Sequence, residues 1–222
     1  MLEAVTFDAY GTLLRNEGLR LIGQRIVADH ELSASVDDVY QAWIEGYYAA
    51  TPVTPFSSLR VIQRQLFGDI LRRLGVDADP APYVDLFFEL TTKVELYPEV
   101  PAMFEALRGV RTVILSNADH EHVAAWAFTL PVEFVLISEA VGAYKPDRRM
   151  FEAAIARLGL EPGQVLHVGD SDVDDVQGAK AAGLRVAWVN RQNRPRRPGV
   201  PEPDFEIADL TPLPGLLARP AC

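Results

Sequence analysis

The fold is decided by residues 2–13, which read LEAVTFDAYGTL. The short apolar run Ala4–Phe7 predicts a buried strand, and this strand would deliver the carboxylate of Asp8 to its C-terminal end. Gly11 then permits a sharp turn, because glycine adopts backbone conformations that a side chain would obstruct. Ligands of open α/β sheets bind beyond the carboxyl ends of the strands, where an aspartate can act as a nucleophile. Asp8 is therefore a candidate catalytic residue, the alternative being an aspartate that only caps a turn.

The composition of the 222-residue chain is that of a soluble globular protein, with 49% hydrophobic and 23% charged residues. Its formal net charge of −10 argues against a nucleic-acid groove, which would need clustered positive charge. The one basic run, Arg191 to Arg197, is interleaved with prolines, and we interpret it as a solvated loop. We therefore expect no nucleic-acid partner.

The same composition predicts a cytoplasmic protein. Cys222 is the only cysteine, so no disulfide can form within one chain, and this suits a reducing compartment. No apolar run approaches the ~20 residues of a membrane span, and the N-terminus lacks the pattern of a signal peptide. We expect no membrane partner, and the sequence does not indicate an oligomeric state.

Apolar residues recur at helical spacing through residues 16–91, and no strand pattern appears there. This stretch predicts a helical subdomain inserted directly after the Asp8 strand. The predicted organisation is a discontinuous α/β core, residues 1–15 and 92–222, with a helical cap at residues 16–91. A cap entering at that point can exclude water and select the substrate.

Strands and helices alternate in the rest of the chain. Short apolar strands are expected at residues 112–116, 134–137, 165–168 and 184–189, with a last edge strand at 205–207. Continuous apolar strands separated by helices predict a parallel sheet that is covered on both faces. The predicted fold class is therefore α/β: a Rossmann-like parallel sheet flanked by helices, with an inserted α-helical cap.

Polar side chains follow several of these strands. The second strand ends in Ser116 and Asn117, a hydroxyl and an amide that could hold substrate oxygens. Lys145, one of three lysines, stands beside a proline at the start of a helix. Helix N-termini favour anions, so a purely surface role gives no reason for a lysine there. A compact ammonium is instead a suitable partner for a phosphoryl oxygen or a carboxylate nucleophile.

The acidic loop at residues 169–179 reads GDSDVDDVQGA and joins a strand to a helix. Carboxylates gathered with Asp8 at one end of a sheet would repel one another unless a cation or a proton intervened. Mg²⁺ suits such a site, because it binds one or two carboxylates and shares phosphate oxygens. Helix N-termini also attract acids, but that alternative does not explain Asp170 at the strand end.

These motifs occur in the order and with the spacing of the haloacid dehalogenase (HAD) superfamily. The chain resembles these aspartyl-nucleophile hydrolases from Phe7 to about Asn190, with a helical cap after the first strand. The resemblance implies that Asp8 is the nucleophile. It also implies that Ser116 and Lys145 bind the oxygens of the transferred group.

The resemblance further implies a Mg²⁺ cofactor. Its ligands would be Asp8, the backbone carbonyl of Tyr10 and Asp170, with Asp175 assisting. The residues expected to shape the loop and the substrate-binding side are Tyr10, Thr12 and Asn117.

The first motif points to a different member of the superfamily. Its phosphatases usually carry a second aspartate, the general acid, where this chain has Tyr10. Losing such a proton donor typically costs ~10²–10⁴ in rate. The motif resembles that of the 2-haloacid dehalogenases, whose halide leaves without a proton. Those enzymes grip the substrate carboxylate with a cap arginine; Gln41 takes that place here, and Arg20 or Arg25 could substitute.

The acidic loop favours a metal-dependent enzyme, because four carboxylates between residues 170 and 175 would repel one another in a metal-free site. Phosphoryl transfer depends mainly on positioning and charge neutralisation. We therefore expect a Mg²⁺-dependent phosphatase whose partner is a small organic phosphate. The alternatives are a metal-independent 2-haloacid dehalogenase and a weakly catalytic binding module of the same fold.

Overall fold

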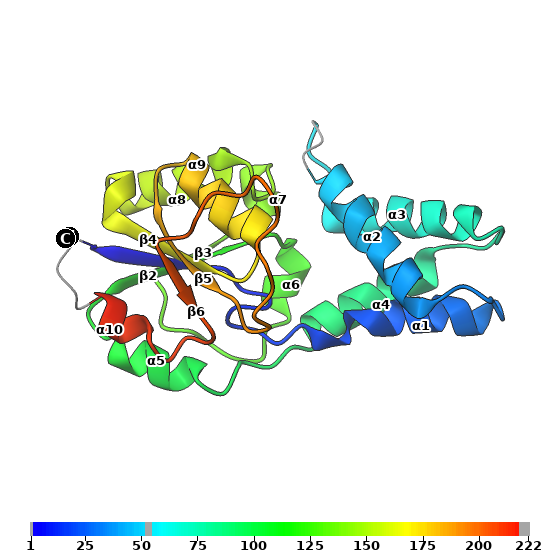
Figure 1. Ribbon diagram of the computed structural model, residues 1–222, viewed down its shortest axis with the longest axis horizontal. Helices are drawn as coiled ribbons and strands as arrows, with labels where there is room; N and C mark the ends of the chain where they lie inside the picture. The colour runs from blue at the N-terminus through cyan, green and yellow to red at the C-terminus, as the bar shows by residue number, and fades with distance from the viewer. Residues whose placement is uncertain (1, 52–54, 218–222) are drawn as a thin grey trace. The chain divides into compact units, whose positions relative to one another are not determined.

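A computed structural model describes residues 2–51 and 55–217 of the chain, so Cys222 lies outside the described residues. Its centre is a six-stranded parallel sheet with the strand order β3-β2-β1-β4-β5-β6 (Figure 1). The strands are β1 (Ala4–Phe7), β2 (Arg111–Ser116), β3 (Phe134–Ile137), β4 (Val165–Gly169), β5 (Arg185–Val189) and β6 (Phe205–Ile207). The predicted Rossmann-like α/β fold is confirmed, and all six expected strands form within a residue or so of their predicted bounds.

The described chain divides into two compact units. The α/β unit contains the sheet together with α5 (Val100–Ala106), α7 (Ser138–Val141), α8 (Arg148–Leu158), η2 (Pro162–Gln164), η3 (Asp172–Gln177), α9 (Gly178–Ala181) and α10 (Leu213–Leu217). Figure 1 shows α8 and α9 on one side of the sheet and α5 and α10 on the other. All four residues of β1 are buried, as expected for a parallel strand that is covered on both faces.

Alternate residues of β1 pack against the two helical layers. Phe7 faces α5, where its ring lies 5.5 Å from that of Phe104. Ala4 belongs to the cluster on the opposite face, which is built around Phe151 of α8. Burying an aromatic or aliphatic side chain of this size contributes ~1.5–3 kcal/mol, so β1 is held firmly from both sides.

The strand order places the polar strand ends at one edge. β1 pairs in parallel with β2 on one side and with β4 on the other. Asp8 follows β1, Ser116 ends β2 and Asp170 follows β4. Because parallel strands end at the same edge, these three side chains emerge together. They do so where the strand order reverses, the usual ligand position in an open α/β sheet.

The second compact unit is helical and comprises Asn16–Val94 and Ala118–Ala127. Its helices are η1 (Glu17–Leu19), α1 (Arg20–Asp29), α2 (Val36–Ala50), α3 (Leu59–Arg73), α4 (Ala81–Thr92) and α6 (His120–Ala124). Ser35 caps α2, its hydroxyl accepting the amide hydrogen of Asp37. Among the described helices, none combines the length and apolar character that crossing a membrane requires.

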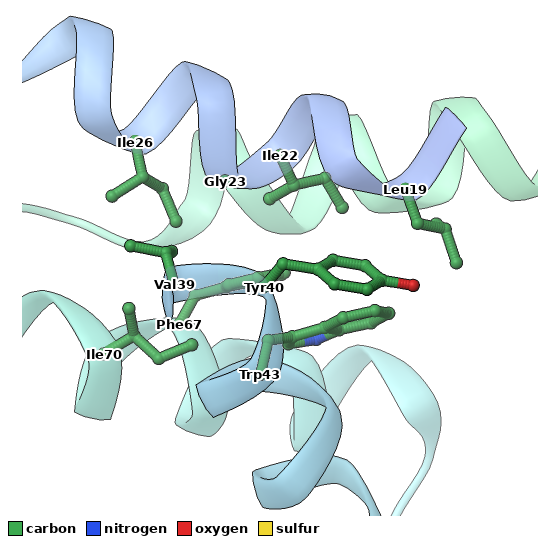
Figure 2. A pocket seen from close by; sticks show the side chains of 9 residues that line it. All are labelled: Leu19, Ile22, Gly23, Ile26, Val39, Tyr40, Trp43, Phe67 and Ile70. Carbon is green, nitrogen blue, oxygen red and sulfur yellow. The ribbon is translucent and has the colours of Figure 1, made fainter. Parts of the chain in front are cut away.

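The interior of the helical unit is packed with aromatic side chains. Trp43 lies nearly parallel to Phe67 and donates its indole hydrogen to Gln63 at 2.7 Å. The apolar side chains of α1, α2 and α3 in Figure 2 surround a cavity of about 10 Å³. A space of this size holds about one water molecule, so the gap is a packing feature and Trp43 is a core residue.

The short helix α6 packs within the helical unit. Asp119 accounts for this packing. Its side chain accepts the amide hydrogens of Leu59 at 3.0 Å and Arg60 at 3.3 Å, and so caps α3 as well as α6. An N-cap acceptor of this kind typically contributes ~1 kcal/mol. One aspartate thus joins two helices that are distant in the sequence.

Candidate active site

Asp8 lies buried at the end of β1 with one free oxygen. Its Oδ1 accepts a hydrogen bond from Lys145 Nζ at 2.7 Å, whereas Oδ2 has no hydrogen-bond partner among the described residues. Burial raises the pKa of Asp8 to about 6, against the opposing pull of Lys145. Above that pH the unpaired oxygen is an anion held away from water, which suits a nucleophile.

Lys145 reaches this carboxylate because Asn117 fixes its backbone. Asn117 accepts the amide hydrogen of Lys145 at 2.7 Å and donates to its carbonyl at 3.1 Å. The ammonium then bridges Asp8 and Asp175, the latter at 2.6 Å. Burial alone would lower the pKa of Lys145, but the two carboxylates outweigh it and raise the pKa, so the lysine stays charged. The side chain of Asn117, which we expected to hold substrate oxygens or to shape the loop, thus positions Lys145.

Asp175 is held by three donors. Its Oδ1 accepts from Lys145 and from His167 at 3.0 Å, and its Oδ2 accepts the amide hydrogen of Ser171 at 2.9 Å. Burial opposes ionisation, but Lys145 and His167 hold the pKa of Asp175 below its usual range. Gly169 makes room for this arrangement, because a Cβ there would collide with the carboxyl group of Asp175. Asp175 itself lies in the π-helical turn η3.

His167 has a role that the sequence did not reveal. It is fully buried, as expected of a packed core residue, but both ring nitrogens are engaged. Nε2 lies 3.0 Å from Asp175, which can only accept, so Nε2 carries the hydrogen and Nδ1 accepts from Thr6 at 2.9 Å. Thr6 and His167 face each other across β1 and β4. Two polar residues in otherwise apolar strands are the signal that could have indicated this pair.

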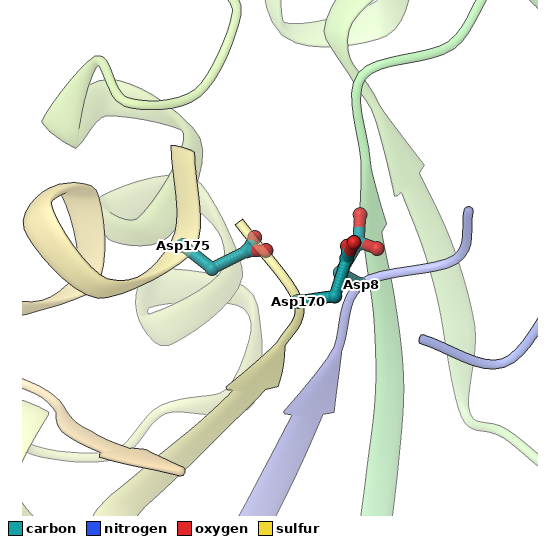
Figure 3. Close-up of side chains that lie close together, drawn as sticks. All are labelled: Asp8, Asp170 and Asp175. Atoms are coloured by element: carbon teal, nitrogen blue, oxygen red, sulfur yellow. The ribbon is translucent and has the colours of Figure 1, made fainter. Parts of the chain in front are cut away.

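Asp170 completes a group of carboxylates that can hold a metal ion. Asp8, Asp170 and Asp175 each offer an oxygen, and these atoms lie within 4.8 Å of one another (Figure 3). Loss of hydration and the charges of Asp8 and Asp175 raise the pKa of Asp170. Gly11, with a φ of +89°, leaves space for this carboxylate, which a Cβ would overlap. A divalent cation would relieve the repulsion, so the donor set fits Mg²⁺.

The other predicted residues lie around this group. Ser116 is buried, and its Oγ has no hydrogen-bond partner among the described residues, so it can donate to a bound oxygen. Thr12 is buried in the loop after β1, and Tyr10 forms an isolated bridge with Leu14 in the same loop. Asp172 accepts the amide hydrogen of Arg197 at 2.7 Å and lies outside the carboxylate group.

The basic run is a loop, as predicted, but it is not uniformly solvated. Arg194 is exposed and makes no ion pair with the described residues, in agreement with the prediction. Arg191 is an exception, because its guanidinium contacts the loop after β1. Charge pattern alone does not show which carbonyl groups face a cation.

Residues 2–183 match the family described as haloacid dehalogenase-like hydrolase. The chain belongs to this family. Membership makes it a hydrolase, and the expected resemblance is confirmed. The match includes all the positions of the carboxylates and the lysine described above.

Relatives within the haloacid dehalogenase-like family have different activities. The chain is 32% identical over 155 residues to a phosphoserine phosphatase of Thermus thermophilus, a match covering 67% of this chain and 62% of that protein. It is 24% identical to (S)-2-haloacid dehalogenase 1 of a Pseudomonas species, over 98% of this chain and 97% of the relative. The L-2-haloacid dehalogenase of Xanthobacter autotrophicus has the same fold, with a TM-score of 0.82, 22% identity and full coverage of both chains. Both phosphatases and dehalogenases are thus among its relatives.

Proposed function

We propose that the chain is a Mg²⁺-dependent hydrolase of a small phosphate monoester. The observation that carries the proposal is that the carboxylates of Asp8, Asp170 and Asp175 lie close to one another, with Lys145 paired to Asp8 and to Asp175. When ionised, these groups leave an excess of negative charge that favours a divalent cation. The likeness to a phosphoserine phosphatase supports the same class of substrate.

The proposed hydrolysis of the phosphate ester has two steps. Asp8 Oδ2, the oxygen without a partner, attacks phosphorus as the bond to the leaving alcohol breaks, and an aspartyl phosphate forms. Water then attacks phosphorus, which releases phosphate and restores the carboxylate. Ser116 donates a hydrogen bond to a phosphoryl oxygen, and Lys145 holds Asp8 in place while balancing its charge. Without a second aspartate at Tyr10, the alcohol takes its proton from solvent, so good leaving groups should react best.

The metal would be held by Asp8, Asp170 and the carbonyl of Tyr10. When bound, Mg²⁺ neutralises charge on the phosphoryl oxygens. Both oxygens of Asp175 already accept hydrogen bonds from the protein, so its assistance would consist in holding Lys145 against Asp8. The helical unit would act as the cap that selects the substrate.

A 2-haloacid dehalogenase is the second candidate, and Tyr10 is the observation that favours it. Halide leaves as a stable anion, and dehalogenation therefore needs no general acid. Such an enzyme also needs a cation for the substrate carboxylate. In the helical unit Arg20 is paired with Asp37, Arg25 is paired with Asp29, and the uncharged Gln41 is exposed. These pairings weigh against the second candidate.

The test is hydrolysis of p-nitrophenyl phosphate with Mg²⁺ and then with EDTA. Its good leaving group minimises the cost of the missing general acid. We expect release of p-nitrophenol that requires Mg²⁺ and disappears in Asp170→Asn. Metal-independent chloride release from L-2-chloropropionate would establish the dehalogenase instead. No turnover of either substrate would favour a binding module.

A further inference from the structure

Arg191 joins the basic loop to the tip of the loop that carries Asp8. Its Nε donates to the carbonyl of Gly11 at 3.2 Å, and its Nη2 donates to the carbonyl of Thr12 at 2.9 Å. Only 19% of the side chain is exposed. The planar guanidinium can serve both carbonyls at once, which a lysine ammonium cannot do with the same geometry.

The same guanidinium contacts a third segment of the α/β unit. It forms an ion pair with Glu99 at 2.7 Å and lies 3.6 Å from the centre of the Tyr97 ring. The amide of Tyr97 in turn donates to the carbonyl of Leu13 at 2.9 Å. Three segments that are far apart in the sequence therefore meet at one side chain, which combines hydrogen bonds, an ion pair and a cation–π contact.

The loop held in this way is compact and begins at the candidate nucleophile. The amides of Leu13 and Leu14 both donate to the carbonyl of Ala9, at 2.9 and 2.8 Å. Ala9 directly follows Asp8, so a shift of the loop tip is transmitted to the carboxylate. It also shifts Gly11, which lies against the carboxylate of Asp170. Misplacing a reacting group by about 1 Å can cost about 10²-fold in rate.

We propose that Arg191 is a positioning residue, which fixes the loop at residues 9–14 by clamping its carbonyls against the Tyr97–Glu99 segment. The proposal rests on Asp8 being the nucleophile, and it is the same whether the substrate is a phosphate ester or a haloacid. It gives the basic loop a function in catalysis without any contact between Arg191 and the substrate.

The experiment compares Arg191→Met and Arg191→Lys with the control Arg196→Met. Arg196 lies on the same loop and forms an ion pair with Glu202. Arg196→Met therefore removes one positive charge and one ion pair from this loop, as Arg191→Met does. The first measurement is amide hydrogen exchange at residues 9–15 and 95–99 of the full chain. We expect Arg191→Met to raise exchange there at least about tenfold, the effect of one lost charge-assisted hydrogen bond, with the sheet unchanged. The control should match the parent.

The second measurement is turnover of p-nitrophenyl phosphate with Mg²⁺, or of L-2-chloropropionate if that is the substrate. We expect kcat of Arg191→Met to fall about 10- to 100-fold with KM within about twofold, and Arg191→Lys to be intermediate. Unchanged exchange at residues 9–15 in a folded Arg191 variant would overturn the clamp. Faster exchange throughout the sheet would also overturn the proposal, because it would indicate a general structural role for Arg191. If the methionine variant does not fold, the lysine variant decides by the same measures.

A parent inactive on both substrates would overturn the proposed function alone, because hydrogen exchange tests the clamp without turnover.

Discussion

Asp8→Asn should make the metal-free protein more stable while abolishing turnover. The buried carboxylate of Asp8 has its pKa raised from 3.8 to about 6, because burial disfavours the charged form. Each pKa unit corresponds to about 1.4 kcal/mol, so the ionised carboxylate destabilises the fold by about 3 kcal/mol. Asparagine keeps an oxygen for Lys145 and removes the charge. The residue proposed as the nucleophile is thus predicted to weaken the fold that holds it.

The sign of the effect depends on pH. Because the folded pKa is the higher one, the penalty is nearly absent below pH 3.8, grows between pH 3.8 and 6, and is complete above pH 6. Asp8→Asn should therefore exceed the parent by up to about 3 kcal/mol at pH 8 and by less than about 1 kcal/mol at pH 4. Urea unfolding followed by circular dichroism, in EDTA so that no cation offsets the charge, measures both differences.

Asp204→Asn is the matched control, for which the expected change in the free energy of unfolding has the opposite sign. Although burial opposes ionisation there, Lys180 and the amide of Val186 lower the pKa of Asp204. Its loss should reduce stability at pH 8, and this reduction should shrink as pH falls. Equal or lower stability of Asp8→Asn at pH 8 would refute the reasoning, and turnover near the parental rate would refute the covalent mechanism.

Two further substitutions test the surroundings of Asp8. Lys145→Met leaves Asp8 and Asp175 buried without their shared cation, and breaking such a pair should cost about 3–5 kcal/mol in urea unfolding; a loss below about 1 kcal/mol would contradict the pairing. Gly11→Ala places a methyl group in the space of the Asp170 carboxylate at a φ of +89°. It should lower stability by about 1–2 kcal/mol and remove metal-dependent hydrolysis, whereas normal activity would show that the loop tolerates a side chain.

The strands and the residues at their ends could be predicted because they depend on local patterns. Apolar runs such as Ala4–Phe7 indicate buried strands, and all parallel strands end at one edge. Asp8, Ser116 and Asp170 therefore had to emerge together once the sheet was inferred. No knowledge of individual side-chain contacts was needed for that step.

The contacts that tune the site could not be predicted, because they join residues distant in the sequence. Asn117 fixes the backbone of Lys145 across 28 positions, and Thr6 contacts His167 across 161. A histidine in an apolar strand has the same pattern whether it only packs or also donates to a carboxylate. Likewise, the prolines and charges around Arg191 are typical of a solvated loop, and only the fold shows that Gly11 and Thr12 lie within its reach.

The charge balance of the site distinguishes phosphate ester hydrolysis from dehalogenation more clearly than the sequence motif around Asp8 and Tyr10 does. With all groups ionised, Asp8, Asp170 and Asp175 exceed Lys145 by two negative charges, and both candidate substrates are anions. A haloacid would need a cation from the protein, but Arg20 and Arg25 are already paired with aspartates of the helical unit. A phosphate ester can approach with Mg²⁺, which the carboxylates themselves attract. Metal should therefore be required for substrate binding as well as for turnover. In the proposed phosphatase reaction, Tyr10 would limit turnover to esters whose alcohol leaves readily, and the acidic loop would account for their binding through Mg²⁺.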